Sequence, residues 1–169
     1  MIGLRQRLRA EEGFGLVELM ISLVVLNVGI LAIVAGFNAG SLALLRANET
    51  STASTLADKQ MELYRAITYP AISLNTTAVD GTYTGDVAYP GTRVTGVCTS
   101  PVADSCIPTR TVTAAQSPNG RPYRIDTFII RYTPTANGRE VKRVTVVVRR
   151  PSPLKVLARL NSNFDQSTG

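Results

Sequence analysis

The stretch GFGLVELMISLVVLNVGILAIVAGF, from Gly13 to Phe37, decides the fold of this chain. The twenty-four residues after Gly13 contain no Lys, Arg, Asp or Pro, and Glu18 is their single ionisable residue. At about 1.5 Å per residue, a helix of this length reaches roughly 36 Å, more than the roughly 30 Å hydrocarbon core of a bilayer. Because lipid cannot satisfy backbone polar groups, the stretch predicts a helical membrane span over residues 14–37.

Charges near this span suggest its orientation and a processing event. Three of the residues in the leader 1–13 are Arg, which predicts a cytoplasmic leader and a C-terminal part outside the cytoplasm. A carboxylate such as Glu18 costs on the order of 3 kcal/mol in hydrocarbon unless it finds a partner. A cut between Gly13 and Phe14 would create an α-amino group four residues before Glu18, and the two charges would neutralise each other. Between two staggered chains, the same pair would fix an axial register.

The motif GFGLVELMISLVVLNVGILAI resembles the class III signal of type IV pilins and type II secretion pseudopilins. In that family a short basic leader ends in Gly, the mature chain starts with Phe, and its fifth residue is Glu. The resemblance implies cleavage by prepilin peptidase between Gly13 and Phe14, N-methylation of Phe14, and a role for Glu18 in assembly and register. Gly15 departs from the Thr or Ser that the family usually has there. A weaker resemblance, to minor pilins of the V class and pseudopilins of the I class, extends through YPAISL at 69–74.

The resemblance also implies a cellular setting. The expected partners are prepilin peptidase, other pilin or pseudopilin subunits, an inner-membrane assembly platform, an assembly ATPase, and membrane lipid before assembly. The chain would be a single-pass cell-membrane protein and then part of a cell-surface or periplasmic filament. Two other interpretations of the stretch stay open. One is an ordinary signal anchor, and the other is a conventional cleaved signal peptide cut near Ala35, Gly36 and Ala39.

Composition gives no positive reason to expect an enzyme. The chain has 169 residues, a net charge of +6 and no His, so a His-based catalytic triad or metal site cannot form. No glycine-rich phosphate loop, paired-carboxylate motif or metal cluster is recognisable, and we expect no cofactor. Without leader and anchor, the chain is long enough for one modest globular domain, over residues 69–169.

Between the span and this domain, residues 38–68 predict an amphipathic continuation of the helix. No Pro occurs before Pro70, which we expect to end it. The apolar face is predicted from a spacing of three, four or seven residues: Leu42, Leu45, Ala53, Leu56, Gln60, Leu63 and Ile67. The predicted polar cover is Arg46, Glu49, Asp58, Lys59, Glu62 and Arg65.

The clearest β pattern is a hairpin, formed by strands at 124–132 and 141–149 around the turn pair Asn137-Gly138. Alternation predicts an apolar face that the amphipathic half of the helix covers. Its predicted members are Phe128, Ile130 and Tyr132 on one strand and Val144, Val146 and Val148 on the other. Weaker strand candidates are 82–89, 92–97 and 110–114. Residues 154–160 predict an edge strand or a short helix, after which the tail is expected to fray. The predicted fold class is α+β, a long N-terminal helix packed on a C-terminal antiparallel sheet, as in pilins.

Two further features bear on partners. Cys98 and Cys106 would close a short loop, and an oxidising exterior favours a disulfide over two free thiols. The C-terminal part is basic, which predicts solvated and edge-protecting strand charges. The alternative is a surface that binds DNA, acidic polysaccharide or anionic lipid headgroups, with Arg149 and Arg150 as the residues considered for DNA or an acidic surface.

Overall fold

The computed structural model describes residues 15–95, 98, 102, 104–136 and 138–166. The chain divides into two compact units, residues 1–44 and 45–169. The described part of the first unit belongs to the helix α1, which runs from Leu16 to Arg65 and continues into the second unit. This helix confirms the predicted helix and its continuation, although it ends at Arg65 rather than at residue 68, and its crossing of a membrane stays a prediction. Thr68 has an extended backbone with φ −70° and ψ 151°, and a short 3-10 helix, η1 (Tyr69–Ala71), follows.

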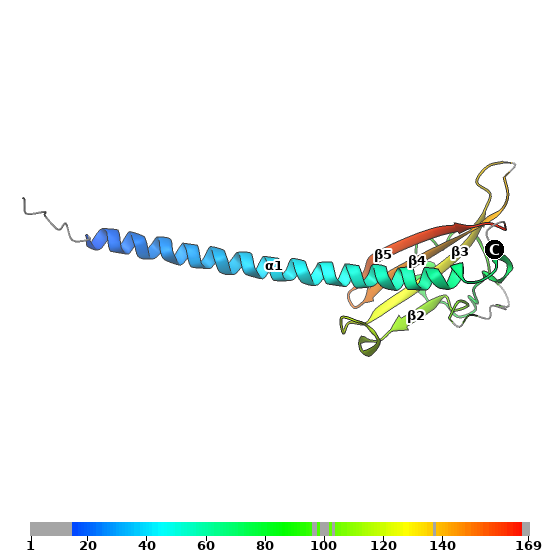
Figure 1. The fold of residues 1–169 in the computed structure, drawn as a ribbon, viewed down its shortest axis with the longest axis horizontal. Coiled ribbons are helices and arrows are strands. Elements are labelled where there is room, and N and C mark those ends of the chain that lie inside the picture. Colours follow the sequence, from blue (N-terminus) through cyan, green and yellow to red (C-terminus); the bar gives the residue numbers. More distant parts are fainter. Residues whose placement is uncertain (1–14, 96–97, 99–101, 103, 137, 167–169) are drawn as a thin grey trace, which may run out of the picture. The chain divides into compact units, whose positions relative to one another are not determined.

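The second unit contains a five-stranded antiparallel sheet packed against the C-terminal part of α1 (Figure 1). Its strands are β1 (Thr92–Arg93), β2 (Thr109–Val112), β3 (Tyr123–Tyr132), β4 (Val141–Pro151) and β5 (Leu154–Phe164). The order is β1-β3-β4-β5, and β2 pairs with the first half of β3. The predicted α+β class and the β3–β4 hairpin are therefore confirmed.

The smaller elements differ in part from the prediction. The candidate strand at 82–89 is wrong, because Asp80 caps a helical turn, α2 (Gly81–Thr84), by accepting a hydrogen bond from the Tyr83 N–H at 2.9 Å. The candidate at 92–97 is reduced to β1, and residues 96–97 lie outside the described part. The candidate at 110–114 is β2, after which the 3-10 helix η2 (Ala114–Gln116) begins. The edge strand β5 extends through Phe164, because residues 161–164 still pair with β4, so the expected fraying there was wrong.

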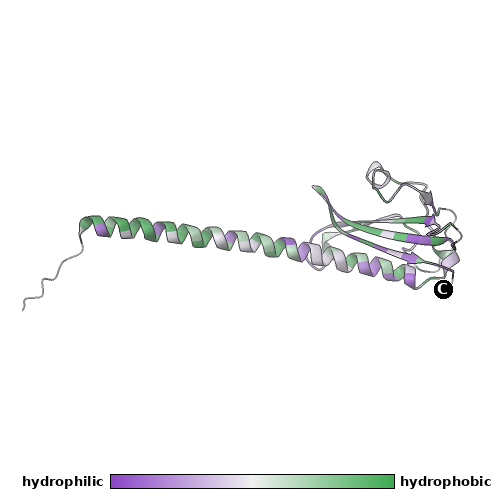
Figure 2. Cartoon of the chain, turned by 90° about the horizontal axis from the view of Figure 1, so that it is seen from above, coloured by the Kyte–Doolittle hydropathy of each residue, from purple (hydrophilic) through white to green (hydrophobic). Residues whose placement is uncertain are grey.

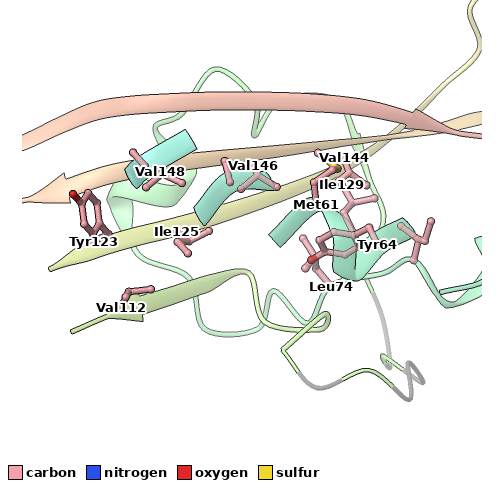
Figure 3. Close-up of a cluster of buried hydrophobic side chains, with 13 residues drawn as sticks. Met61, Tyr64, Leu74, Val112, Tyr123, Ile125, Ile129, Val144, Val146 and Val148 are labelled. Carbon is pink, nitrogen blue, oxygen red and sulfur yellow. The ribbon is translucent and has the colours of Figure 1, made fainter. Parts of the chain in front are cut away.

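The main core lies between the C-terminal part of α1 and one face of the sheet (Figure 3). The helix contributes Ala53, Ala57, Met61 and Tyr64, all at most 1% exposed. From the sheet come Tyr123, Ile125, Ile129, Val144, Val146 and Val148. The face predicted for β4 is confirmed, but the one predicted for β3 was wrong. The register pairs Ile129 with Val144 and Ile125 with Val148, so these residues share the helix-facing side.

The helix face was also predicted only in part. Ala53 and Gln60 are buried as expected, whereas Leu56 is only partly buried. Glu49 had been assigned to the polar cover, yet it is 3% exposed. The contact with the sheet follows one narrow stripe of α1, at positions 53, 57, 60, 61 and 64. Periodicity alone did not distinguish this stripe from the adjacent positions on the helix.

A second, smaller cluster lies on the opposite face of the sheet and consists of Tyr83, Phe128 and Val147. The Tyr83 and Phe128 rings are stacked, with centroids 4.3 Å apart. The Tyr83 hydroxyl donates a hydrogen bond to the Thr127 carbonyl at 2.5 Å. The segment that carries α2 thus covers the face of the sheet that α1 does not.

Candidate functional site

The N-terminal part of α1 is apolar and exposed throughout. Its most apolar window has a mean hydropathy of 2.5, none of it is buried, and among the described residues α1 is the one helix long and apolar enough to cross a membrane. Figure 2 shows this part of the helix predominantly in the colours of hydrophobic residues. An apolar surface of this length has no stable place in water, so it requires lipid or other protein surfaces around it.

Glu18 lies in the first turn of this helix and is exposed. Its backbone N–H donates to the Gly15 carbonyl at 2.9 Å, which begins the helical hydrogen bonding. Among the described residues, no cation forms an ion pair with the Glu18 carboxylate. Gly13 and Phe14, the predicted cleavage and methylation positions, lie outside the described residues. Cleavage, methylation and the assembly role of Glu18 therefore stay predictions.

The second unit contains an ionic cluster on the sheet face opposite α1, built from Arg124, Asp126, Arg149 and Arg159 of the sheet with Asp80 and Asp86 of the covering segment. Asp126 is fully buried and accepts hydrogen bonds from Arg149 Nε at 2.9 Å, Arg124 Nε at 2.8 Å and the Thr109 hydroxyl at 2.9 Å. Asp86 binds Arg149 and also Arg159, the latter through two hydrogen bonds. The cluster joins β3, β4 and β5 to the covering segment.

These contacts hold the Asp80 and Asp86 carboxylates in their charged form. The Arg124 guanidinium and the Tyr83 N–H lower the pKa of Asp80 below its ordinary range. Burial raises the pKa of Asp86, but hydrogen bonds from Arg159, the Ala88 N–H and Arg149 more than offset it, so the net direction is downward. Asp80 and Asp86 are therefore ionised partners of these arginines at neutral pH.

A separate ion pair links α1 to the end of β4. The Glu49 carboxylate binds the Arg150 guanidinium through two hydrogen bonds, and Arg121 Nη1 lies 3.8 Å from the same carboxylate. The hydrogen bond from Arg150 lowers the pKa of Glu49 despite the opposing effect of burial. Sequence reasoning missed this pair. The available signal was an acidic residue about one helical turn before Ala53, where the buried stripe begins, and it was too weak to distinguish burial from exposure.

The arginines considered for an acidic partner are thus engaged inside the domain. Arg149 is 7% exposed and bound to Asp86 and Asp126, and Arg150 is bound to Glu49. Binding of DNA through these two side chains would require that they leave carboxylates that are themselves buried, which is costly.

The predicted disulfide is present. Cys98 and Cys106 are bonded, with their Cα atoms 5.6 Å apart. The loop is joined to the helix, because the Tyr64 hydroxyl donates a hydrogen bond to the Ser105 carbonyl at 2.9 Å. Burial raises the pKa of Tyr64 to about 12, so this hydroxyl remains a donor at neutral pH.

Beside this loop, a groove of about 480 Å³ runs between α1 and β2, lined in part by Leu56, Leu63, Val112 and Ile125. Its charged rim includes Asp104 and Arg110, which form an ion pair at 2.8 Å. Within the described part of the chain, no group of three or more metal-binding side chains occurs. The described lining of the groove thus combines apolar side chains with an ion pair.

Comparisons with protein-family models, curated proteins and solved structures found no match. The architecture itself is pilin-like, with a long N-terminal apolar helix whose C-terminal part packs on an antiparallel sheet. The apolar helix is typical of a membrane anchor or signal, and the disulfide is typical of a domain outside the cytoplasm.

Proposed function

We propose that this chain is a minor pilin or pseudopilin, cut by prepilin peptidase after Gly13, methylated on Phe14 and assembled into a type IV pilus-like filament. The observation that carries the proposal is Glu18, which lies in the first turn of a fifty-residue helix whose following residues are exposed and mostly apolar as far as Phe37. The β-rich domain and the unusual Gly15 favour a minor subunit over a major one.

Function would then reside in assembly rather than catalysis. In the membrane, the apolar part of α1 is solvated by lipid. In the filament, the same surface packs against the helices of other subunits, and Glu18 pairs with the Phe14 amine of its own or a neighbouring subunit. A wrongly staggered subunit leaves a buried charge unpaired, which costs several kcal/mol. The assembly platform and ATPase would supply the work of extraction from the bilayer.

The test has two parts, carried out in the native host. Intact mass and N-terminal peptide sequencing should give a mature chain that begins with N-methylated Phe14. Glu18→Gln should leave the membrane-bound amount unchanged but remove the protein from sheared filaments, whereas Ser22→Ala, one turn further along the exposed helix, should assemble normally. An intact leader, a cut near Ala39, or normal assembly of Glu18→Gln would overturn the proposal.

Two alternatives give different results in these experiments. A pseudopilin of a secretion or DNA-uptake machine would show the same processing but form a short periplasmic filament, and genes for that machine beside this one would identify it. An anchored domain that does not polymerise would keep its leader and tolerate Glu18→Gln without effect.

A further inference from the structure

Cations cluster at one end of the second unit. This is the end where the second unit's part of α1 begins. Around Glu49 lie Arg150, which binds it, Arg121 at 3.8 Å, and Lys155, whose charge also acts on the Glu49 carboxyl. Arg46 is exposed and lies one helical turn before Glu49 on a neighbouring face of α1. Four cations around one carboxylate leave a local excess of positive charge.

Exposed apolar side chains lie at the same end of the sheet as these cations. Leu154 is 55% exposed and Val156 is 42% exposed, and Lys155 lies between them at the start of the edge strand β5. We call the set Arg46, Arg121, Leu154, Lys155 and Val156 the basic rim. Cations mixed with exposed apolar side chains are typical of surfaces that lie at the membrane interface.

Chain connectivity keeps the basic rim near the bilayer. Eight residues lie between Phe37, the end of the apolar run, and Arg46, which makes nine steps along the chain. Even fully extended, such a segment reaches only about 30 Å, and as a helix about 13 Å. The opposite end of β4, where the β3–β4 turn contains Ala136, is separated from the basic rim by the length of that strand, about 35 Å.

We propose that the basic rim binds anionic phospholipid headgroups of the bilayer that holds α1, with Leu154 and Val156 entering the boundary between headgroups and acyl chains. This inference rests on the proposed membrane-stored state of the subunit. Each Lys or Arg near an anionic bilayer strengthens its attraction about fivefold, so three exposed cations together contribute roughly a hundredfold. The domain would be held against the membrane until extraction, when these contacts are lost.

The absence of Trp from the chain makes a single introduced Trp a specific reporter. Three full-length variants are placed separately in nanodiscs of phosphatidylcholine, or of phosphatidylcholine with phosphatidylglycerol, made with acyl-brominated lipids that quench nearby Trp. L154W reports on the basic rim and A136W on the opposite end of β4. L26W, within the apolar helix, reports on membrane insertion.

We expect the L154W fluorescence to be quenched about twofold more in the anionic discs than in phosphatidylcholine discs, and less at high salt. The A136W reporter should be unquenched in both. Adding R46Q, R121Q and K155Q to L154W should abolish the extra quenching seen in anionic discs, while the Glu49–Arg150 ion pair stays intact. The matched control K59Q, R131Q and R139Q removes three exposed cations outside the basic rim. It should leave the extra quenching in anionic discs unchanged.

Quenching of L154W no stronger than that of A136W would overturn the proposal, as would equal quenching in both lipids. Equal loss of the extra quenching in anionic discs with the two triple variants would also overturn it. An L154W signal that responds to added double-stranded DNA but not to anionic lipid would assign the basic rim to nucleic acid instead. If L26W is itself unquenched, the membrane anchor fails, which distinguishes failure of the proposed function from failure of this inference.

Discussion

The Glu49 carboxylate on α1 and the Arg150 guanidinium on β4 form a doubly hydrogen-bonded ion pair, although 101 residues separate them in the sequence. The pair lies where α1 first contacts the sheet, and the Glu49 side chain is almost completely removed from solvent. It therefore connects the helix to the sheet at the buried position of α1 that is nearest in sequence to the exposed apolar part of the helix.

Loss of this pair should loosen the helix from the sheet. We expect Glu49→Gln to lower the thermal unfolding midpoint of the full chain in detergent by roughly 5 °C, because the Arg150 charge loses its partner. Near-ultraviolet circular dichroism of the tyrosines would measure it. The double variant E49Q/R150Q should lose less than the sum of the single variants. Glu62→Gln is the control, since the Glu62–Arg65 pair is mostly exposed and should contribute little. Additive effects of E49Q and R150Q would contradict the coupling.

The buried Asp126 should matter more than any exposed carboxylate. Asp126→Ala leaves the Arg149 guanidinium with one fewer partner in a buried position, and we expect the free energy of unfolding to fall by about 3–5 kcal/mol. Chemical denaturation of the full chain in detergent measures this change. Asp58→Ala, on the exposed side of α1, should change it by less than about 0.5 kcal/mol. Similar effects for the two variants would show that the cluster is not a stabilising element.

Acid should weaken the domain in a defined range of pH. The folded pKa values of Glu49, Asp80 and Asp86 are lowered from ordinary values of 4.5, 3.8 and 3.8. The unfolded chain therefore takes up protons first as pH falls. Their stabilisation is complete above the ordinary values and is lost as pH falls through the folded values. Unfolding midpoints should be nearly constant down to about pH 5 and decline below about pH 4. In E49Q/D86N the decline should be shallower, and an unchanged decline would contradict the assignment.

The position of the core stripe on α1 can be tested with two neighbouring residues. Met61 is completely buried, so Met61→Ala should cost about 2–4 kcal/mol in the free energy of unfolding. Leu63 was predicted to face the core but is only partly buried, so Leu63→Ala should cost about 1 kcal/mol. Chemical denaturation of both variants measures the difference. A larger loss of unfolding free energy for Leu63→Ala than for Met61→Ala would show that the face predicted from periodicity is the one that packs on the sheet.

Local sequence patterns were sufficient to predict the long helix and the central β-hairpin. The uninterrupted apolar run defined α1, because a membrane-length run without Pro has no other stable form in lipid. Alternation and the Asn137-Gly138 turn pair defined the β3–β4 hairpin, because both are properties of adjacent residues. Alternation placed Val144, Val146 and Val148 together on one side, and the expected oxidising exterior predicted the Cys98–Cys106 disulfide.

Only the tertiary structure decided which faces meet and which charges pair. Both sides of β3 are apolar, with Ile125 and Ile129 on one and Phe128 on the other, so the strand pattern did not reveal the helix-facing side until the register with β4 fixed it. Glu49, Asp126 and Arg149 look like ordinary surface charges in the sequence. Their burial depends on partners 101, 23 and 63 residues away, because an ion pair is a property of distance in space that no local period encodes.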